Sequence, residues 1–516
     1  MIKIYLYIMV LFAVGFGGVH LCLREEASRR FGLVLYATLA VLYAICVFTH
    51  GGLIFRIALA AMVLVSPGDE TAVGCRYLAL LMLIPNVNYP VMIGHLYLLD
   101  LSAVGAMSLA AMIAVFARPR LPGALRKFTV EDALVLVLFL ILGVAADRID
   151  SPTAHMRLAL SMLIAIVMPY AVLRRTGGTR QAFYPLIETL AGAAIIVAVI
   201  AVYQALHHWS LFDIIWSNQS FGNMAAGEVL IRGGLMRAKA TFADAISCAD
   251  FEMLGIFAIY AARRSFRSDA LWLGAMALVG LGMLAAQSRG SLVALAVGFI
   301  TIEIARRRFA RAAAALALAA ILGSGVLLAA HGNARVAQFV MAGQSSTSSD
   351  LDYRQTLLRR GLQEGEKHLW TGNDANVMLA DLSDLVQGEH IVDMVNSYLY
   401  FFLVSGLAGT IPLALLMAAA MRKSFARSRT EARDHGFAVT QGFVYSALPG
   451  LLVALTVTSF YERMPAMLLL ALVANRGLHR GPVTFRVAGA SRDPAAGAAR
   501  RPFAWKGKSD TTAAAA

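Results

Sequence analysis

The chain has 516 residues, of which 59% are hydrophobic and 15% are charged, whereas soluble globular proteins carry about 25% charged residues. This many apolar side chains cannot be hidden in one water-soluble core, so the composition excludes an ordinary soluble protein and predicts a membrane protein. The formal net charge is +14, but the lysines and arginines lie in short clusters between apolar runs, a pattern typical of cytoplasmic loops rather than of nucleic-acid binding.

Apolar runs of the length that crosses a bilayer, about 20 residues, recur along the chain. We expect an all-α polytopic membrane protein with about 12–15 transmembrane helices. Residues 4–23 are predicted as the first span, because the run is too long and continuous for a cleavable signal peptide. The predicted spans are 4–23, 31–48, 52–66, 77–95, 97–117, 131–147, 156–173, 184–206, 250–262, 270–286, 290–305, 311–330, 394–420, 436–458 and 464–475.

The charge distribution predicts an orientation. One set of alternate loops holds roughly two thirds of the chain's 45 lysines and arginines, so this set is assigned to the cytoplasm. The N-terminus is then outside and the C-terminus inside. The cytoplasmic segments are 24–30, 67–76, 118–130, 174–183, 263–269, 306–311, 421–435 and the tail from 476.

This topology divides the chain into alternating membrane and loop segments. Two external segments are long, and long loops are usually functional. In the second of them, 353–370 is predicted as an external helix with Leu357, Leu358, Leu362 and Leu369 available for one face. The predicted segments are an N-terminal transmembrane bundle 1–206, a first external loop 207–249, transmembrane helices 250–330, a large external loop 331–393, C-terminal transmembrane helices 394–475 and a disordered basic tail 476–516.

Basic residues on the outer face at membrane depth are candidates for function. They are Arg232, Arg237, Lys239, Arg289, Arg354 and Arg463. Each alone is explained by a side chain that snorkels to the headgroups. If several converge, their guanidinium groups form a site for a pyrophosphate, which arginine binds in a bidentate manner. Arg289 stands in "QSRG", the tight turn between two predicted spans.

Four stretches between residues 230 and 420 resemble one family. "MLAAQSRGSLVALAVGFI" is similar to the serine-arginine-glycine span of the O-antigen ligase and Wzy-type polysaccharide polymerase family. "LMRAKATF" resembles its Arg-x-x-Gly-Thr-Phe stretch, with Ala240 where glycine is usual. "DYRQTLLRRGLQEGEKHLWTGND" resembles the arginine-bearing helix of its periplasmic loop, with Gly372 in a degenerate turn. "VNSYLYFFLVSGLAGTIPLALL" resembles its loop-to-span signature, with Gly406 and Gly409 as the glycine pair.

The resemblance implies a fold and an activity. It implies a glycosyltransferase of GT-C-like architecture with a large periplasmic loop, placed in the bacterial inner membrane with the active site facing the periplasm. The substrate would be an undecaprenyl-pyrophosphate-linked glycan, with membrane lipid and other polysaccharide assembly and export proteins as partners. Arg237 and Arg289, supported by Arg354, would bind the pyrophosphate, and neither a metal nor another cofactor would be required.

The last signature departs from the ligase pattern, which has His-Asn at its start. Val395 precedes Asn396 here, and "VDMVNSYL" is more similar to the aspartate-containing variant of exopolysaccharide polymerases. The resemblance therefore favours a polymerase over a ligase that transfers polymer to lipid A core or protein. Asp393 and His390 are the candidates for a general base. Asn396 and Tyr398 are candidates for glycan binding, although packing at the start of a helix also explains them.

A transporter or flippase is the competing class. Such proteins often contain inverted repeats and broken spans near the midplane. Asn86 and Asn88 in "LIPNVNYP" are the one sign of a broken span, and the other polar residues concentrate in the two external loops. A scaffold of a polysaccharide export system is a third alternative, but it would not need the arginines.

Overall fold

The computed structural model describes most of the chain up to Gly477. The described residues are 1–49, 52–93, 95–119, 128–145, 152–177, 180–219, 231–232, 235–313, 317, 344–386, 392, 394–427, 435–460 and 463–477. The predicted tail 476–516 therefore lies almost wholly outside them, as do His390, Asp393 and most of the predicted span 311–330. The described part within residues 1–479 is one compact unit.

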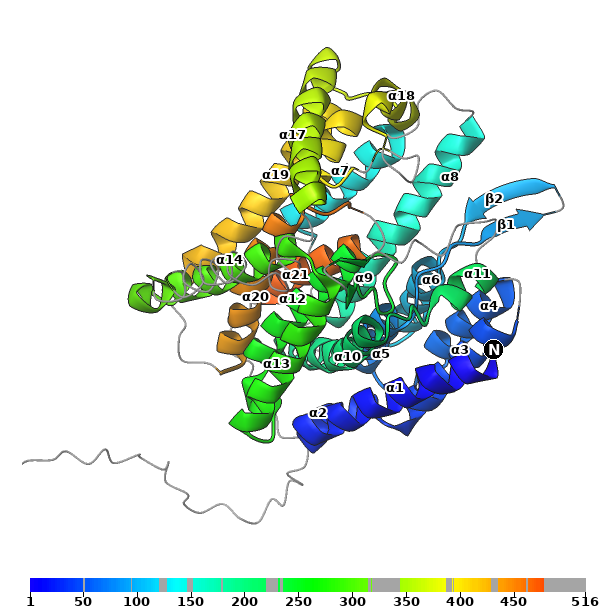
Figure 1. The fold of residues 1–516 in the computed structure, drawn as a ribbon, viewed down its shortest axis with the longest axis vertical. Coiled ribbons are helices and arrows are strands. Elements are labelled where there is room, and N and C mark those ends of the chain that lie inside the picture. Colours follow the sequence, from blue (N-terminus) through cyan, green and yellow to red (C-terminus); the bar gives the residue numbers. More distant parts are fainter. Residues whose placement is uncertain are drawn as a thin grey trace, which may run out of the picture. The chain divides into compact units, whose positions relative to one another are not determined.

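The secondary structure is mainly helical (Figure 1). The elements are α1 (Ile2–Cys22), α2 (Glu25–Ser28), η1 (Arg29–Phe31), α3 (Leu33–Phe48), α4 (Gly52–Leu64), α5 (Glu70–Leu83), β1 (Pro90–Ile93), β2 (Leu96–Asp100), α6 (Ala103–Phe116), α7 (Val130–Ala145), α8 (Pro152–Met162), η2 (Leu163–Val167), α9 (Met168–Thr176), α10 (Arg180–His207), α11 (Asp213–Gln219), β3 (Ile231–Arg232), β4 (Leu235–Met236), α12 (Ala245–Ala261), η3 (Arg263–Ser265), α13 (Asp269–Ala286), α14 (Arg289–Ala305), α17 (Gln344–Lys367), α18 (Ala375–Asp381), η4 (Ser383–Leu385), α19 (Ser397–Arg427), α20 (His435–Ala454) and α21 (Met464–Gly477).

Several helices have the length and composition of membrane spans. Within the described residues, six apolar helical stretches have at least 18 residues, and four further apolar helices are shorter. The long stretches are Ile2–Cys22, Glu25–Phe48, Thr153–Thr176, Phe183–His207, Asp269–Ala286 and Ser397–Arg422. A spanning helix satisfies its own backbone polar groups, which lipid cannot do. The protein is therefore a mainly α-helical, membrane-embedded protein.

Helix α10 is the central element of the bundle. It packs against α1, α5, α12 and α13 (Figure 1). Most of its apolar stretch is buried, and small residues such as Ala194 and Ala198 lie at its contacts with α12 and α13. Small side chains allow helix backbones to approach closely in a membrane, where the packing itself supplies the attraction.

The predicted helical spans 77–95 and 97–117 are wrong at their outer ends. α5 ends at Leu83, and β1 and β2 form an antiparallel hairpin before α6 begins at Ala103. Pro90 has no backbone N–H and cannot continue a helix. The Asn86 side chain accepts a hydrogen bond from the Val104 N–H (3.1 Å) and so caps α6. Within the described residues, the fold is thus all-α apart from two short antiparallel strand pairs, this one and β3–β4.

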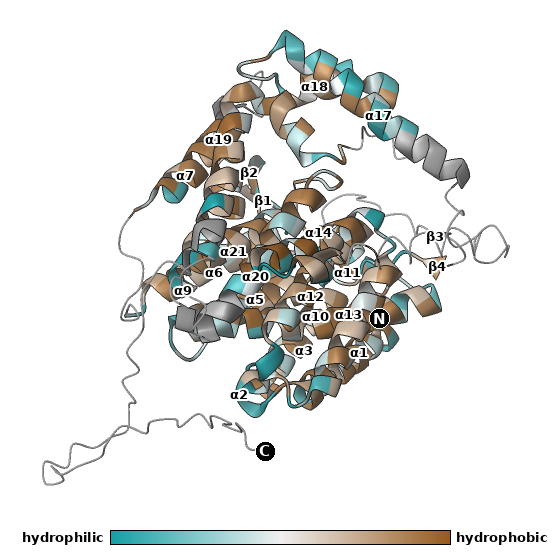
Figure 2. Cartoon of the chain, turned by 90° about the vertical axis from the view of Figure 1, so that its left-hand side faces the viewer, coloured by the Kyte–Doolittle hydropathy of each residue, from teal (hydrophilic) through white to brown (hydrophobic). Residues whose placement is uncertain are grey.

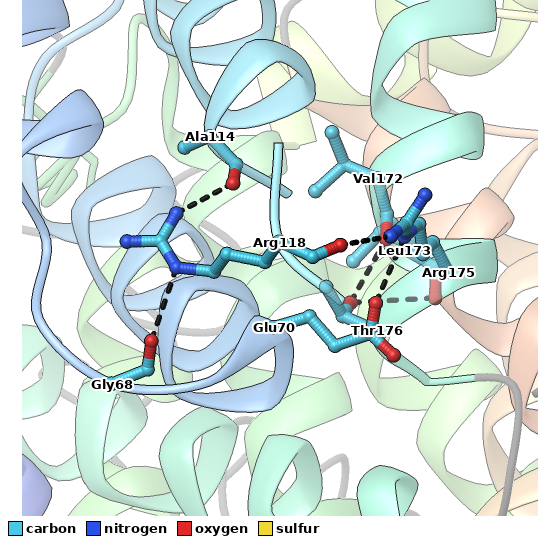
Figure 3. Close-up of polar contacts among 8 residues, drawn as sticks. All are labelled: Gly68, Glu70, Ala114, Arg118, Val172, Leu173, Arg175 and Thr176. Atoms are coloured by element: carbon cyan, nitrogen blue, oxygen red, sulfur yellow. Dashed lines mark hydrogen bonds and ion pairs between the residues drawn. The ribbon is translucent and has the colours of Figure 1, made fainter. Parts of the chain in front are cut away.

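The segments predicted to be cytoplasmic contact one another. Arg118 Nε donates to the Gly68 carbonyl (3.0 Å), and Arg175 forms an ion pair with the buried Glu70 (2.8 Å) while its second nitrogen donates to the Arg118 carbonyl (2.7 Å) (Figure 3). Predicted segments 24–30 and 263–269 also meet, since Arg24 donates to Phe266 and Arg267 donates to Leu23. We call the face formed by these loops the basic face.

The segments predicted to be external meet at the other ends of the same helices. α5 begins at the basic face with Glu70, and the carbonyls of Met82 and Ile84 at its far end accept hydrogen bonds from Arg463. α13 likewise begins beside the basic face and ends at Ala286, whose carbonyl accepts a hydrogen bond from Arg237 (3.4 Å). The alternation of charge therefore predicts which loops share a face.

Candidate functional site

The segment 237–242, which is predicted to be external, is fixed to the end of α13. The Ala238 N–H donates to the Ala285 carbonyl (3.0 Å), and Arg237 Nε donates to the Ala286 carbonyl (3.4 Å). The preceding residues form the short β3–β4 pair, in which Arg232 is opposite Leu235. Arg237 is partly buried. A segment about fifty residues earlier in the chain is thereby held directly beside the turn that carries Arg289.

Ala240 has a left-handed backbone conformation, with φ of 48°. Its N–H donates to the Oε1 atom of the buried Gln204 (2.8 Å), and the next residue, Thr241, donates its hydroxyl to the Met82 carbonyl (2.7 Å). Glycine adopts this conformation without the steric cost that a Cβ brings. The left-handed backbone at position 240 would therefore suit glycine better than the alanine that this chain has there.

Lys239 lies close to a partly buried acid, Asp213. Asp213, the first residue of α11, accepts a hydrogen bond from Ser210 Oγ (2.6 Å). Burial raises the pKa of Asp213, while the Ser210 hydrogen bond and the positive charge of Lys239 act in the opposite direction. Lys239 therefore has an anionic neighbour within the protein.

The "QSRG" stretch forms a tight turn between two spans. α13 ends at Ala286, Gln287 is left-handed (φ 54°), and Ser288 is the N-cap of α14, whose first residue is Arg289. A Cβ on Gly290 would lie 2.2 Å from the Cγ2 atom of Val457. The glycine is therefore required because the loop after α20 approaches the turn closely.

Arg289 and Arg237 belong to the same corner of the protein. The carbonyl that Arg237 contacts belongs to Ala286, three residues before Arg289. The Cα atoms of Ala286 and Arg289 are therefore at most about 11 Å apart. Arg289 is exposed, and both arginines also take part in interactions within the protein. We refer to Arg237, Arg289 and the turn 286–291 as the arginine corner.

The start of α19 is bound to the same corner through the loop 455–459. Ser397 Oγ donates to the Thr458 carbonyl (2.6 Å), and Ser459 Oγ donates to the Met394 carbonyl (2.9 Å). Val457 of this loop contacts the turn at Gly290. The "VNSYL" signature and the "SRG" turn, about one hundred residues apart in sequence, are therefore separated by a single loop.

Asn396 and Tyr398 both have structural partners. Asn396 Oδ1 accepts hydrogen bonds from the Tyr398 N–H (3.0 Å) and the Leu399 N–H (3.1 Å), which makes it the N-cap of α19. The Tyr398 hydroxyl donates to the Leu452 carbonyl in α20 (2.8 Å). These contacts fix the first turn of α19, in agreement with the packing interpretation of the two residues.

Arg354 is on α17, a helix that packs along α19 (Figure 1). α17 contains more hydrophilic residues than α19 (Figure 2). Its contact face consists of Leu357, which is buried, with Gly361 and Gly365 against Leu399 and Phe402. The predicted leucine face is therefore wrong beyond Leu357, since Leu358, Leu362 and Leu369 are 40–45% exposed. Arg354 is partly buried, one helical turn before Leu357.

Two glycines join the end of α17 to a break in α19. Gly406 interrupts α19 with φ of 59° and ψ of −155°, and Gly372 has φ of 70°. The Leu407 N–H donates to the Leu369 carbonyl (2.8 Å), the Ala408 N–H to the Trp370 carbonyl (3.0 Å) and the Asn373 N–H to the Leu403 carbonyl (2.9 Å). We call this arrangement the glycine clasp.

Arg463 has a structural role. Its side chain is fully buried, and its guanidinium donates to the carbonyls of Met82, Ile84 and Thr241 and lies 4.2 Å from the ring centre of Phe242. It therefore links the N-terminal end of α21 to the end of α5 and to the segment 237–242.

Sequence reasoning missed an acidic residue inside α12. Asp250 is fully buried, and its Oδ1 atom accepts a hydrogen bond from the Ser291 hydroxyl (2.6 Å), one helical turn into α14. The signal was present in "ISCADFEML", because an aspartate within an apolar run is costly in a membrane and marks a candidate site.

The described residues contain no group of three or more histidine, cysteine, aspartate or glutamate side chains arranged to hold a metal ion. The two candidate bases, His390 and Asp393, lie outside the part of the chain that the structure describes.

Of the other predicted site residues, the structure places Arg237, Arg289 and the start of α19 together, and Arg354 lies on α17, the helix that packs along α19.

The comparisons with known proteins give no family for this chain. It matches no protein-family model. No curated protein matches it either.

Proposed function

We propose that the protein is a membrane glycosyltransferase that polymerises undecaprenyl-pyrophosphate-linked oligosaccharide repeats into a surface polysaccharide at the periplasmic face of the bacterial inner membrane. The observation that carries the proposal is the contact between Arg237 and the Ala286 carbonyl (3.4 Å), which brings a second guanidinium to the turn of Arg289. Arginine binds phosphate oxygens in a bidentate manner and stays charged at membrane depth.

The arginine corner suits a lipid-linked substrate. Next to the turn, Leu281 and Leu284 of α13 and Leu292 and Val293 of α14 are 39–57% exposed. Such residues offer an apolar surface to lipid chains on both sides of Arg289. A polyprenyl chain could lie along these helices while its diphosphate, at the level of the headgroups, reaches the two arginines.

The reaction follows from the charge of the leaving group. The bond between the anomeric carbon and the diphosphate oxygen breaks, and the oxygen keeps the electron pair. The acceptor hydroxyl oxygen forms the new bond to the same carbon, and its proton goes to a base, for which Asp393 and His390 are the proposed candidates. Fixed guanidinium groups stabilise the diphosphate most when its charge increases, which lowers the barrier to transfer.

The polymerase is preferred to the ligase because "VDMVNSYL" lacks the histidine directly before Asn396. The proposed architecture is GT-C-like, with α17 and α18 as the helices of the large periplasmic loop. The helical break at Gly406 and the clasp that fills it attach these external helices to the membrane bundle.

The decisive experiment replaces Arg289 and Arg237 individually with alanine in cells that produce the polysaccharide, and then measures lipid-linked intermediates and chain length. Arg311, an exposed arginine at the basic face, provides the matched control as Arg311→Ala. We expect both corner variants to accumulate single lipid-linked repeats without long polymer, while the control keeps normal chain lengths.

Other outcomes would contradict the proposal in different ways. Normal chain length with polymer left on the lipid carrier would indicate a ligase. Loss of polymer with the lipid-linked repeats retained on the cytoplasmic side of the membrane would indicate a flippase and remove the enzyme interpretation. Protein levels of each variant, measured in the membrane fraction, separate loss of activity from loss of protein.

A further inference from the structure

The buried Asp250 lies directly below the arginine corner. It is on α12, is fully buried, and is outside every set of residues used in the mechanism above. A carboxyl group at this depth is costly and requires polar partners. One of its partners in the structure is Ser291 of α14, whose hydroxyl donates to Asp250 Oδ1 (2.6 Å), and the Thr458 side chain is a second.

The Asp250 carboxyl continues into the turn that carries Arg289. Ser291 Oγ is 2.8 Å from Ser288 Oγ, and Ser288 is the N-cap that accepts a hydrogen bond from the Ser291 N–H (3.4 Å). Ser288 and Ser291 are both buried. Asp250, Ser291 and Ser288 thus form a continuous chain from the interior of α12 to the residue immediately before Arg289.

This arrangement exceeds what a helix cap requires. Two other helices of the bundle have a serine N-cap whose oxygen accepts one backbone hydrogen bond: Ser268 caps α13 (3.2 Å to Leu271 N) and Ser102 caps α6 (2.9 Å to Gly105 N). In α14 the cap is itself held by a second serine, and that serine by a buried acid. The first turn of α14 is therefore fixed to α12 by side chains as well as by packing.

We infer that Asp250 is a positioning residue for Arg289: through Ser291 and Ser288 it fixes the first turn of α14, and so the direction in which the guanidinium meets a diphosphate. The inference rests on the proposed function, because it assumes that Arg289 binds the diphosphate. It assigns no chemical step to Asp250, which is too deeply buried to touch the substrate.

The test measures the affinity of the purified protein in lipid nanodiscs for undecaprenyl pyrophosphate. Asp250→Ala removes the acceptor for Ser291, and we expect a loss of affinity of about tenfold to a hundredfold, the range for a hydrogen bond to a charged group. Asp250→Asn keeps an oxygen acceptor, so its loss should be smaller. Ser268→Ala, the cap at the basic face, should leave the affinity unchanged.

A double-mutant cycle with Arg289→Lys distinguishes positioning from general damage. Lysine cannot bind phosphate in the bidentate manner that requires a fixed direction, so Asp250→Ala should cost little more affinity when it is combined with Arg289→Lys. Additive losses in the cycle would show that Asp250 acts on the fold as a whole and would overturn the inference. If Asp250→Ala does not accumulate, Ser291→Ala and Asp250→Asn give the same cycle.

The inference and the proposed function fail in distinguishable ways. If Arg289→Ala weakens binding and shortens the polymer while Asp250→Ala changes neither, the positioning role is wrong and the proposed function stands. If Arg289→Ala itself changes neither binding nor polymer, the proposed function fails and the inference fails with it.

Discussion

Gly406 gives the sharpest test of how the end of α17 is attached to α19. We predict that Gly406→Ala severely destabilises the protein, whereas Gly280→Ala, at an open helical position of α13, does not. Gly406 has φ of 59° and ψ of −155°, a region of conformational space occupied almost exclusively by glycine, where another residue costs about 1–3 kcal/mol. A Cβ there would also lie 2.5 Å from the Trp370 carbonyl carbon and 2.6 Å from the backbone nitrogens of Thr371 and Gly372.

These contacts are with backbone atoms, so no side-chain rotation relieves them. Overpacking of this kind adds about 1–3 kcal/mol, and the two effects together amount to about 2–6 kcal/mol. That is a large share of a total stability that is typically about 5–15 kcal/mol. By contrast, a Cβ on Gly280, within α13, would meet no atom within 4 Å, so the change should stay within about 1 kcal/mol, the helix-propensity difference between glycine and alanine.

The assay is thermal unfolding of detergent-solubilised protein, followed by the loss of the monodisperse peak in size-exclusion chromatography. The alanine variant at Gly406 should unfold at a clearly lower temperature than both the parent protein and the variant at Gly280. Limited proteolysis should then cut first between α17 and α19, because the strained residue holds the three backbone hydrogen bonds of the glycine clasp. Equal melting temperatures for the two variants would refute the reasoning.

Three further predictions concern single positions. Ala240→Gly should raise the melting temperature by removing a left-handed alanine, a gain of about 1 kcal/mol; a lower melting temperature would contradict the backbone assignment. Gly290→Ala should abolish polymer formation because its Cβ would lie 2.2 Å from the Val457 side chain. Val457→Ala in the same chain should partly restore polymer formation, and a double variant without polymer would show that this contact is not the cause. Glu252→Met should stabilise the protein by about 1–3 kcal/mol. Glu252 is fully buried, and its carboxylate oxygens have no hydrogen-bond partner among the described residues. An unchanged or lower melting temperature would show that the carboxyl group has hydrogen-bond partners in the folded protein.

The sequence by itself determined the class of protein and most of its helices. The predicted spans 4–23, 31–48, 184–206 and 270–286 correspond closely to α1, α3, α10 and α13. The reason is local: a helix in lipid satisfies its own backbone hydrogen bonds, so length and hydropathy suffice to define it. Charge likewise predicted which loops meet, as the contacts of Arg175 and Arg118 at the basic face illustrate.

The tertiary structure decided what lies next to what. Neither hydropathy nor charge shows that Arg237 reaches the Ala286 carbonyl or that Asp250 accepts a hydrogen bond from Ser291, because each pair joins segments more than forty residues apart. Asn86 and Asn88 indicated a broken span, but the strand pairing at Pro90 was not predicted, and the break at Gly406 lies inside an apolar run that reads as continuous helix. Backbone groups freed at such breaks are satisfied by neighbouring segments, and packing alone selects those neighbours.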